Sequence, residues 1–169
     1  MSIAAPATNP SGHLELKLPA TIGAAGEVLQ NSTTAGTLEM GSPFRPAFSA
    51  YTSSSFDLAA STWVKQLFQT EYFDTDSAYD TSTSTFTVPA NMGGAYQINA
   101  GVSVDDINDG TYIAINLYVD GSEATGFYRR FIYASANNRI ATATFSNVVK
   151  LTAGQTVNIL DNTSNEFFL

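Results

Sequence analysis

Imidazole and thiol groups are almost absent from this chain of 169 residues, since His13 is the only histidine and there is no cysteine. A Ser–His–Asp triad needs a histidine beside its nucleophile, and a zinc site needs several cysteine or histidine ligands. Serine and threonine hydroxyls are abundant, but a hydroxyl without a positioned base is a poor nucleophile. A pair of carboxylates, as in glycoside hydrolases, is the one catalytic arrangement that the sequence leaves open. We therefore expect no enzymatic activity, no cofactor, and a structural or surface role for His13.

The densest group of oxygen ligands is the run Asp105-Asp106-Ile107-Asn108-Asp109-Gly110. Calcium takes several carboxylate and amide oxygens from a flexible loop, so Asp105, Asp106, Asn108 and Asp109 are weak candidate ligands. Their spacing is not that of an EF-hand loop. A solvated turn rich in Asp and Asn is the interpretation we favour, because these residues commonly form turns without any metal.

The overall charge of the chain limits its partners. The formal net charge is −8, and only 13% of the residues are charged. A nucleic-acid partner would require a basic patch that replaces phosphate counterions, so none is expected. The N-terminus lacks the cationic and apolar regions of a secretion signal, and no run of about 18 apolar residues occurs. We therefore expect synthesis in a cytoplasm and no membrane insertion.

The segment Tyr96–Val104 is the clearest strand of the chain, and the other elements are placed around it. Its apolar side chains fall on one face and its polar or small side chains on the other, which is the period of a half-buried strand. The apolar face holds Tyr96, Ile98, Ala100, Val102 and Val104.

Further strands are expected on both sides of this segment. Residues 84–88 form one strand, which ends at Pro89, and residues 112–119 alternate up to the turn signal Asp120-Gly121. Residues 62–68 are apolar on both faces; β-branched and aromatic content favours a strand there over an amphipathic helix. From Ala47 onward we count about eight or nine strand-like runs at short spacing, the pattern of an all-β sandwich or jelly roll.

Residues 1–42 differ in composition from the rest of the chain. Ala, Thr, Gly, Pro and Ser dominate them, so the segment cannot bury enough apolar surface to fold alone. It is either a flexible linker or an extended arm with short strands that attaches to a partner. In the second case the aliphatic residues anchor the arm by strand pairing and by side-chain pockets. These residues are Leu14, Leu16, Leu18, Val28 and Leu29.

A family resemblance appears in residues 46–169. The pattern Tyr79-Asp80-x-Ser82-Thr83-x-x-Phe86-x-x-Pro89, followed by a glycine turn and Gly94-x-Tyr96-x-Ile98, resembles the central signature of the complement C1q and tumour-necrosis-factor jelly rolls. The opening Pro46-Ala47-Phe48-Ser49-Ala50 is similar to the family's first strand. The sequence departs from the family at Gln155, which stands where Asp is usual, and at residues 165–169, where the family closes with Phe-x-Gly-x-Leu-Leu.

That resemblance implies an all-β, C1q/TNF-like jelly-roll sandwich over residues 43–169, preceded by the N-terminal arm. It also implies a homotrimer, in which three jelly rolls pack about a threefold axis through aromatic and aliphatic side chains. The residues expected to form the core or the trimer contacts are Phe48, Phe86, Tyr96 and Ile98.

The N-terminal arm carries a second resemblance, to a segment common in bacteriophage fibre and virion-surface proteins. The motif comprises a short strand ending in Leu18-Pro19, then Gly23-x-x-Gly26-x-Val28-Leu29, then residues 35–41. It implies a structural protein of the bacteriophage virion surface: a trimeric capsid decoration, cement or head-fibre protein made in the host cytoplasm. Residues 1–42 would bind the major capsid protein or another virion protein.

Two alternatives stay open at this point. A short tail fibre would use the jelly roll as a receptor-binding tip, with a host-surface receptor as its partner. A soluble C1q/TNF-like binding module is less favoured, because such modules usually carry a secretion signal and a collagen-like stalk or membrane anchor.

Overall fold

The computed structural model describes residues 17–32, 34, 36–41, 43, 45–54, 62–107, 111–127, 129–132 and 139–163. Over these residues the chain is all-β, as expected, and contains no helix. A helix long and apolar enough to cross a membrane is accordingly not found in the described part of the chain. The chain forms two compact units, residues 1–45 and residues 46–169, and each is described by itself.

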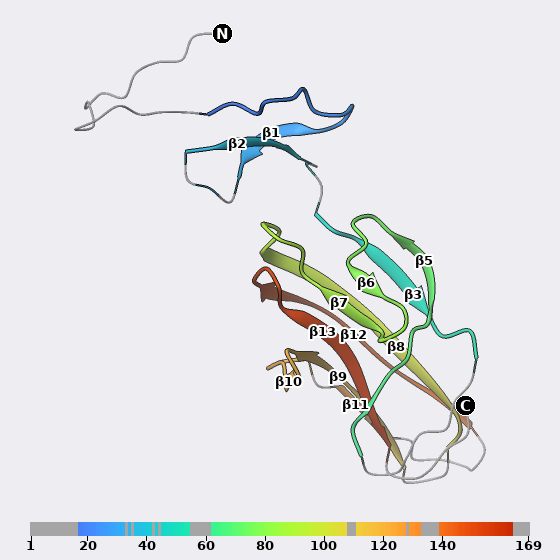
Figure 1. Ribbon diagram of the computed structural model, residues 1–169. Helices are drawn as coiled ribbons and strands as arrows, with labels where there is room; N and C mark the ends of the chain where they lie inside the picture. Colours follow the sequence, from blue (N-terminus) through green and yellow to red (C-terminus); the bar gives the residue numbers. More distant parts are fainter. Residues whose placement is uncertain are drawn as a thin grey trace. The chain divides into compact units, whose positions relative to one another are not determined.

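The N-terminal unit is built on a small antiparallel hairpin. Strands β1 (Val28–Asn31) and β2 (Leu38–Gly41) pair along their whole length (Figure 1). The backbone of Lys17 adds an isolated parallel bridge beside β2: its N–H donates to the Gly36 carbonyl at 3.1 Å, and its carbonyl accepts from the Leu38 N–H at 2.9 Å. Backbone pairing therefore organises this unit, which has few large side chains to bury.

The larger unit contains the remaining strands, which vary from two to fourteen residues in length. They are β3 (Phe48–Tyr51), β4 (Val64–Lys65), β5 (Thr70–Asp74), β6 (Tyr79–Asp80), β7 (Thr85–Thr87), β8 (Gly94–Ile107), β9 (Tyr112–Val119), β10 (Ser122–Glu123), β11 (Arg129–Ile132), β12 (Arg139–Leu151) and β13 (Thr156–Thr163).

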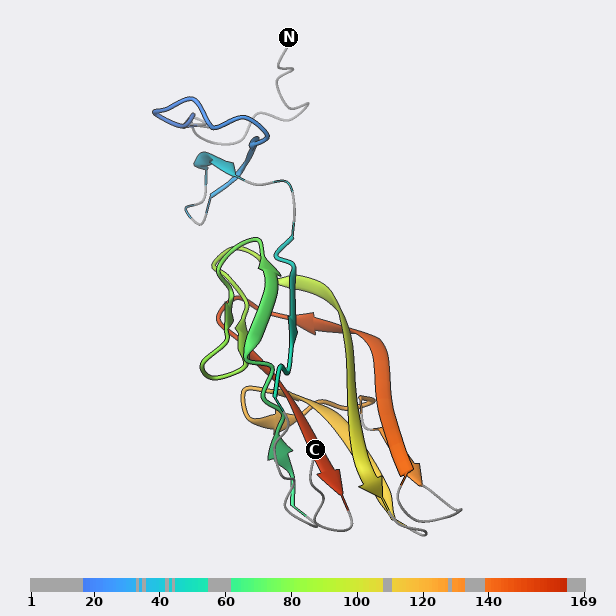
Figure 2. The same ribbon diagram turned by 90° about the vertical axis from the view of Figure 1, so that its right-hand side faces the viewer.

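These strands form several antiparallel sheets that share one core. The largest sheet has the order β10-β9-β13-β7-β6, with β11 also paired to β9 and β4 to β13. A second sheet consists of β8 and β12, which run side by side (Figures 1 and 2), and a third consists of β3 and β5. Buried side chains come from both large sheets, for example Val104 of β8 and Leu117 of β9. The arrangement is consistent with an all-β sandwich.

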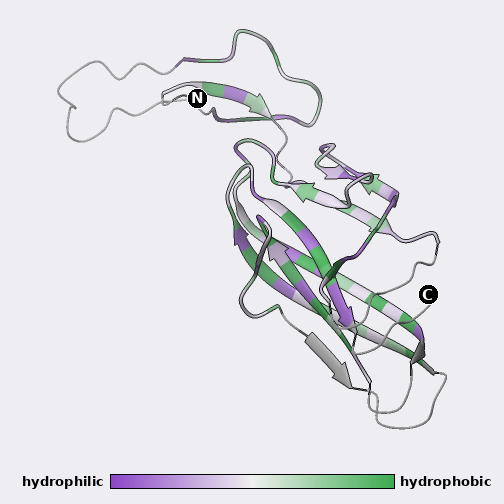
Figure 3. Cartoon of the chain, turned by 60° about the horizontal axis from the view of Figure 1, so that its bottom comes forward, coloured by the Kyte–Doolittle hydropathy of each residue, from purple (hydrophilic) through white to green (hydrophobic). Residues whose placement is uncertain are grey.

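The faces of β8 are those that alternation in the sequence predicted. Tyr96, Val102 and Val104 are buried, and Ile98 and Ala100 pack against the core at its edge. The intervening residues 97, 99, 101 and 103 are exposed. Alternating hydropathy is visible along the long strands in Figure 3. The burial of these residues confirms the prediction. The prediction succeeds because a strand with one buried face must alternate with a period of two.

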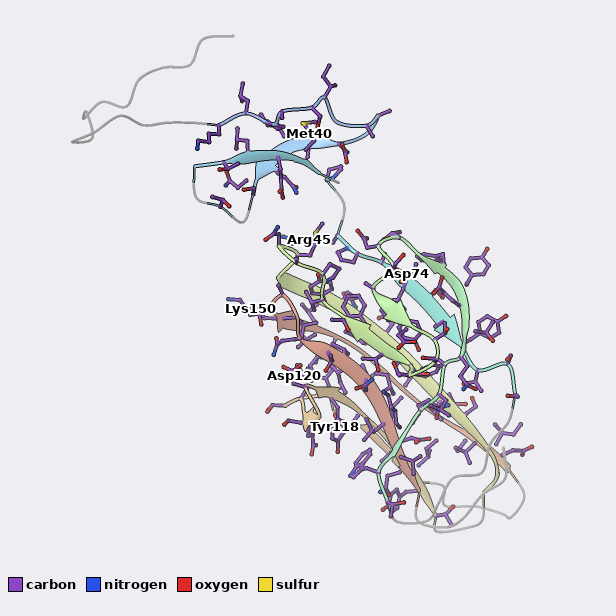
Figure 4. The ribbon with its side chains drawn as sticks, in the orientation of Figure 1. Met40, Arg45, Asp74, Tyr118, Asp120 and Lys150 are labelled. Atoms are coloured by element: carbon purple, nitrogen blue, oxygen red, sulfur yellow. The ribbon has the colours of Figure 1, made fainter. Side chains whose placement is uncertain are left out.

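The predicted turn at Asp120-Gly121 is also confirmed, and it serves as a clamp. Both residues have positive φ, 49° and 75°, as a tight two-residue hairpin loop between β9 and β10 requires. The Asp120 carboxylate accepts hydrogen bonds from the Thr156 N–H at 2.8 Å and from Gln155 Nε2 at 2.9 Å (Figure 4). These bonds hold the carboxylate in its charged form and lower its pKa. The turn is thereby fixed to the start of β13.

The strand expected over residues 62–68 is much shorter in the structure. Only Val64–Lys65 forms a strand, β4, which pairs with β13. The Gln66 N–H still donates to the Ile159 carbonyl at 2.9 Å, but the Phe68 N–H donates to Ser84 Oγ at 2.9 Å. A side-chain acceptor thus replaces the neighbouring strand and ends the ladder.

Candidate functional site: a cleft between two strand edges

A cleft of about 750 Å³ lies in the larger unit, between β3 and β8. One side is the unbroken run 48–54, and the other is the unbroken run 97–103. If the face of a sheet lined the cleft, only alternate residues of each strand would reach it. Unbroken runs show that the edges of the two strands line it. The floor comes from the larger sheet and the loops beside it, and consists of Gln66, Phe68, Tyr79, Ser84, Phe86, Val157, Asn158 and Ile159.

Stacked aromatic rings form the apolar part of the cleft. The Phe48 ring lies 4.5 Å from the Tyr79 ring and 5.1 Å from the Phe86 ring, centroid to centroid, with interplanar angles of 13° and 17°. Phe86 in turn contacts Tyr96 at 5.7 Å. Aromatic pairs of this kind contribute beyond the area that they bury. The cleft therefore has a rigid apolar floor at the β3 end.

Gln66 is the polar side chain of the cleft that lacks a full set of partners. It is buried, with 4% of its surface exposed. Its Nε2 atom donates to Thr52 Oγ1 at 3.3 Å, whereas its Oε1 atom has no hydrogen-bond partner. A buried acceptor without a donor is unfavourable by about 1–3 kcal/mol, and this oxygen has almost no surface open to the cleft.

The other polar groups on the floor are satisfied within the chain. Asn158 Nδ2 donates to the Ser84 carbonyl and to Thr85 Oγ1, both at 3.0 Å. The Tyr79 hydroxyl donates to the Phe68 carbonyl at 2.9 Å, and burial raises the pKa of this phenol. Neither a nucleophile–base pair nor a group of three or more His, Cys, Asp or Glu side chains occurs among the described residues of the cleft. The geometry of the cleft suits binding.

Asp161 of β13 is a buried carboxylate that the sequence did not single out. It has no exposed surface, and neither of its carboxylate oxygens has a hydrogen-bond partner. Its neighbours across the sheet are Ile115 of β9 and Val64 of β4, which are both apolar. Burial in these surroundings raises the pKa of Asp161 to about 7. The carboxyl group is therefore largely neutral below that pH.

Asp105 is the one weak calcium candidate whose side chain the structure describes. Asp105 is exposed near the end of β8, and the backbone of Asp106 belongs to the same strand. Asn108 and Asp109 lie outside the described residues, as does His13.

The anchor residues proposed for the N-terminal arm are exposed where the structure describes them. Leu18, Val28 and Leu29 have 68%, 42% and 50% of their surfaces exposed. Leu14 and Leu16 lie outside the described residues. Ile22 of the same unit is also fully exposed. Four large aliphatic side chains exposed on so small a unit are unusual unless a partner covers them.

Of the four residues expected to form the core or the trimer contacts, Phe48, Phe86 and Ile98 line the cleft. Phe86 and Tyr96 are buried in the core, and the Tyr96 hydroxyl donates to the Met92 carbonyl. Phe48 and Ile98 are partly buried and line opposite sides of the cleft. The Asp80 carboxylate accepts hydrogen bonds from Ser82 and Thr83, which order the turn that follows β6. The same hydrogen bonds lower the pKa of Asp80 to about 2.

No protein-family model matches the chain, and a search of curated proteins finds no match. The inferences below therefore rest on the sequence patterns and on the geometry described above.

Proposed function

We propose that this chain is a structural protein of a bacteriophage virion: a homotrimeric capsid decoration, cement or head-fibre protein. In this proposal residues 46–169 form a C1q/TNF-like jelly roll that projects from the particle. Residues 1–45 attach it to the major capsid protein or to another virion protein.

The observation that carries this proposal is the N-terminal unit itself. It is a separate compact unit, held mainly by the β1–β2 pairing and the bridge at Lys17, and it exposes Leu18, Val28 and Leu29. Such a unit gains more by binding a partner than by folding alone, because its apolar surface is not buried internally. This is what an attachment segment requires.

The order of the strands supports the jelly roll. β13, the last strand described, lies between β9 and β7, and β12 lies beside β8. Strands far apart in sequence are therefore neighbours in space, as in the double Greek key of a jelly roll. Contact between copies is supported by the outer face of β12, where Ile140 and Val148 are largely exposed.

The proposal is tested with charge substitutions in the full-length chain. Val28→Glu combined with Leu29→Glu places carboxylates on both faces of β1, where these two side chains are exposed. Thr21→Glu combined with Asn31→Glu adds the same charge at exposed positions of the same unit without removing aliphatic groups. We expect the first pair to reduce co-sedimentation with tail-less capsids that lack this protein by about tenfold or more, and the second pair to retain most of the binding.

Two outcomes would contradict the proposal. Binding of the unsubstituted chain only to tails or to host cells would favour the short tail fibre with a receptor-binding tip. Binding to no part of the particle would favour a soluble C1q/TNF-like module.

A further inference from the structure

The two sides of the cleft are strand edges with spare pairing capacity. Among the described residues, β8 pairs along one edge only, with β12, and β3 pairs along one edge only, with β5. The opposite edges line the cleft through residues 97–103 and 48–54. A strand presents N–H and C=O groups along both edges, so two open edges that line one cleft are suited to receive an added strand.

The side chains around the cleft specify what kind of strand fits. Toward the floor, the occupant meets Phe86, Ile98 and Ile159, which require apolar groups. On the outer side, it lies beside Gln97 and Asn99, which are polar and exposed. The occupant must therefore alternate apolar and polar residues with a period of two.

The N-terminal arm contains a segment with this pattern. Residues 12–16 read Gly-His-Leu-Glu-Leu, so Leu14 and Leu16 share one face while His13 and Glu15 share the other. The backbone of Lys17 already bonds within the N-terminal unit, which sets the end of the segment at Leu16. By contrast, residues 165–169 place Phe167, Phe168 and Leu169 in succession, which puts apolar groups on both faces.

We propose that the cleft of one copy binds residues 12–16 of a second copy as an added strand. Leu14 and Leu16 face the apolar floor, and Glu15 faces solvent beside β8. This inference rests on the proposed function in one respect: a strand given to another copy is a means of assembly, which the homotrimeric structural protein requires. It assigns residues 12–16 to contact between copies and leaves Val28 and Leu29 of β1 for the virion partner.

Disulfide trapping tests this exchange with little background, because the chain has no cysteine of its own. Neighbouring residues on paired strands lie close enough for a disulfide. One full-length copy carries Leu14→Cys or Leu16→Cys, and a second full-length copy with an affinity tag carries Ala100→Cys, an inward position of β8. After the two copies are mixed and oxidised, the mixed disulfide dimer is separated by mass and confirmed by mass spectrometry of the linked peptides.

The matched control uses the alternation of side chains between the two faces of a strand. Glu15→Cys should link to Asn99→Cys, an outward position, and should link to Ala100→Cys about tenfold less than Leu14→Cys or Leu16→Cys does, because adjacent residues face opposite sides. Circular dichroism of each variant before oxidation verifies that it is folded. Ile98→Cys and Val102→Cys replace Ala100→Cys if that variant fails to fold or if the register is shifted.

Several results would overturn the inference. One is a single chain carrying both Leu14→Cys and Ala100→Cys that forms the disulfide only within itself. Another is a Glu15→Cys copy that links to Ala100→Cys as efficiently as the Leu14→Cys or Leu16→Cys copy does. A third is linkage of Ala100→Cys to Phe168→Cys in place of Leu14→Cys or Leu16→Cys. Absence of linkage in all folded variants would also overturn it. None of these results bears on the capsid-binding assay, so failure of the strand exchange and failure of the proposed function are separable.

Discussion

The rings of Phe48 and Tyr79 stack face to face, with centroids 4.5 Å apart and planes inclined by 13°. Phe48 belongs to β3, and Tyr79 belongs to β6 of the larger sheet. In the described residues β3 has ladder pairing only with β5, so aromatic packing attaches this side of the cleft to the rest of the unit. The position of β3 therefore depends on side chains more than on backbone hydrogen bonds.

Phe48→Ala is accordingly expected to destabilise the larger unit and to loosen the cleft. We expect a loss of about 3 kcal/mol, the lower end of the range for a buried phenylalanine, because Phe48 is only partly buried. Tyr72→Ala on the neighbouring strand removes an exposed ring and should change stability by less than about 0.5 kcal/mol. Urea unfolding of the full-length chain measures both; equal effects would show that the stack does not hold β3.

Tyr96→Ala should be more severe, because the ring of Tyr96 is buried and touches Phe86. Removing a core aromatic residue is expected to lower the free energy of unfolding by about 3–5 kcal/mol. Tyr96→Phe keeps the ring and loses only the hydrogen bond to the Met92 carbonyl, so its expected effect is about 1 kcal/mol. Thermal unfolding of the two variants beside Gln97→Ala, on the exposed face, checks this order. An unchanged melting temperature for Tyr96→Ala would contradict the assignment of faces.

Asp161 should make the folded unit less stable as the pH rises. Its pKa is raised from 3.8 to about 7 on folding, so the folded state binds more protons than the unfolded state between these values. Stability therefore falls from about pH 4 to about pH 7 and then levels off, by up to about 4 kcal/mol at 1.4 kcal/mol per pH unit. Asp161→Asn cannot ionise, so it should flatten this slope. A slope unchanged in the variant would mean that the carboxyl group stays charged in the fold.

Asp80 supplies a control of opposite sign. Its pKa is lowered from 3.8 to about 2 by hydrogen bonds to the charged form, so its contribution to stability is present above about pH 4 and is lost as the pH falls toward 2. Asp80→Asn should thus affect the acid side of the profile and leave the slope between pH 4 and pH 7 intact. Denaturant unfolding over a series of pH values separates the two carboxylates.

The full-length chain should sediment as a trimer at micromolar concentration. Ile140 and Val148, which are exposed on β12, provide apolar surface for contact between copies. An interface built on such contacts is only weakly screened by salt, so the species should persist from low to high ionic strength. Sedimentation velocity across a salt series measures this, and a monomer at micromolar concentration would count against the trimer.

Alternation along residues 96–104 was sufficient to assign both faces of β8, because one face is buried over the whole segment. Asp120-Gly121 was sufficient to place the hairpin turn, because few dipeptides accept positive φ at both positions. The strand at residues 62–68 was predicted too long. The Phe68 N–H donates to Ser84 Oγ, and β-propensity contains no information about this contact between distant residues. Local patterns therefore succeeded where local forces decide, and they failed where a contact with a residue distant in the sequence decides.

The cleft and the buried carboxylate escaped sequence analysis for a different reason. The cleft exists only where the edges of β3 and β8 approach, and residue types do not encode which edge of a strand stays unpaired. Asp161 does follow Val157 and Ile159 at the spacing of an inward face. That signal was available, but a carboxylate at such a position ordinarily argues for exposure.

The long β8–β12 ladder has a consequence for how fast the molecule folds. Its register pairs Gly94 with Leu151 at one end and Ile107 with Arg139 at the other, so each pairing closes a long loop of chain. Chains dominated by such distant pairings have high contact order and fold on a scale of milliseconds to seconds. The β9–β10 hairpin closes a much shorter loop and should form earlier. Trp63, the only tryptophan, has its ring 6.2 Å from that of Tyr118 on β9, so stopped-flow refolding followed through its fluorescence would time the packing of the segment before β4 against β9. Until the ladder closes, the edges of both strands are open to other nascent copies, so a high rate of synthesis would favour aggregation over folding.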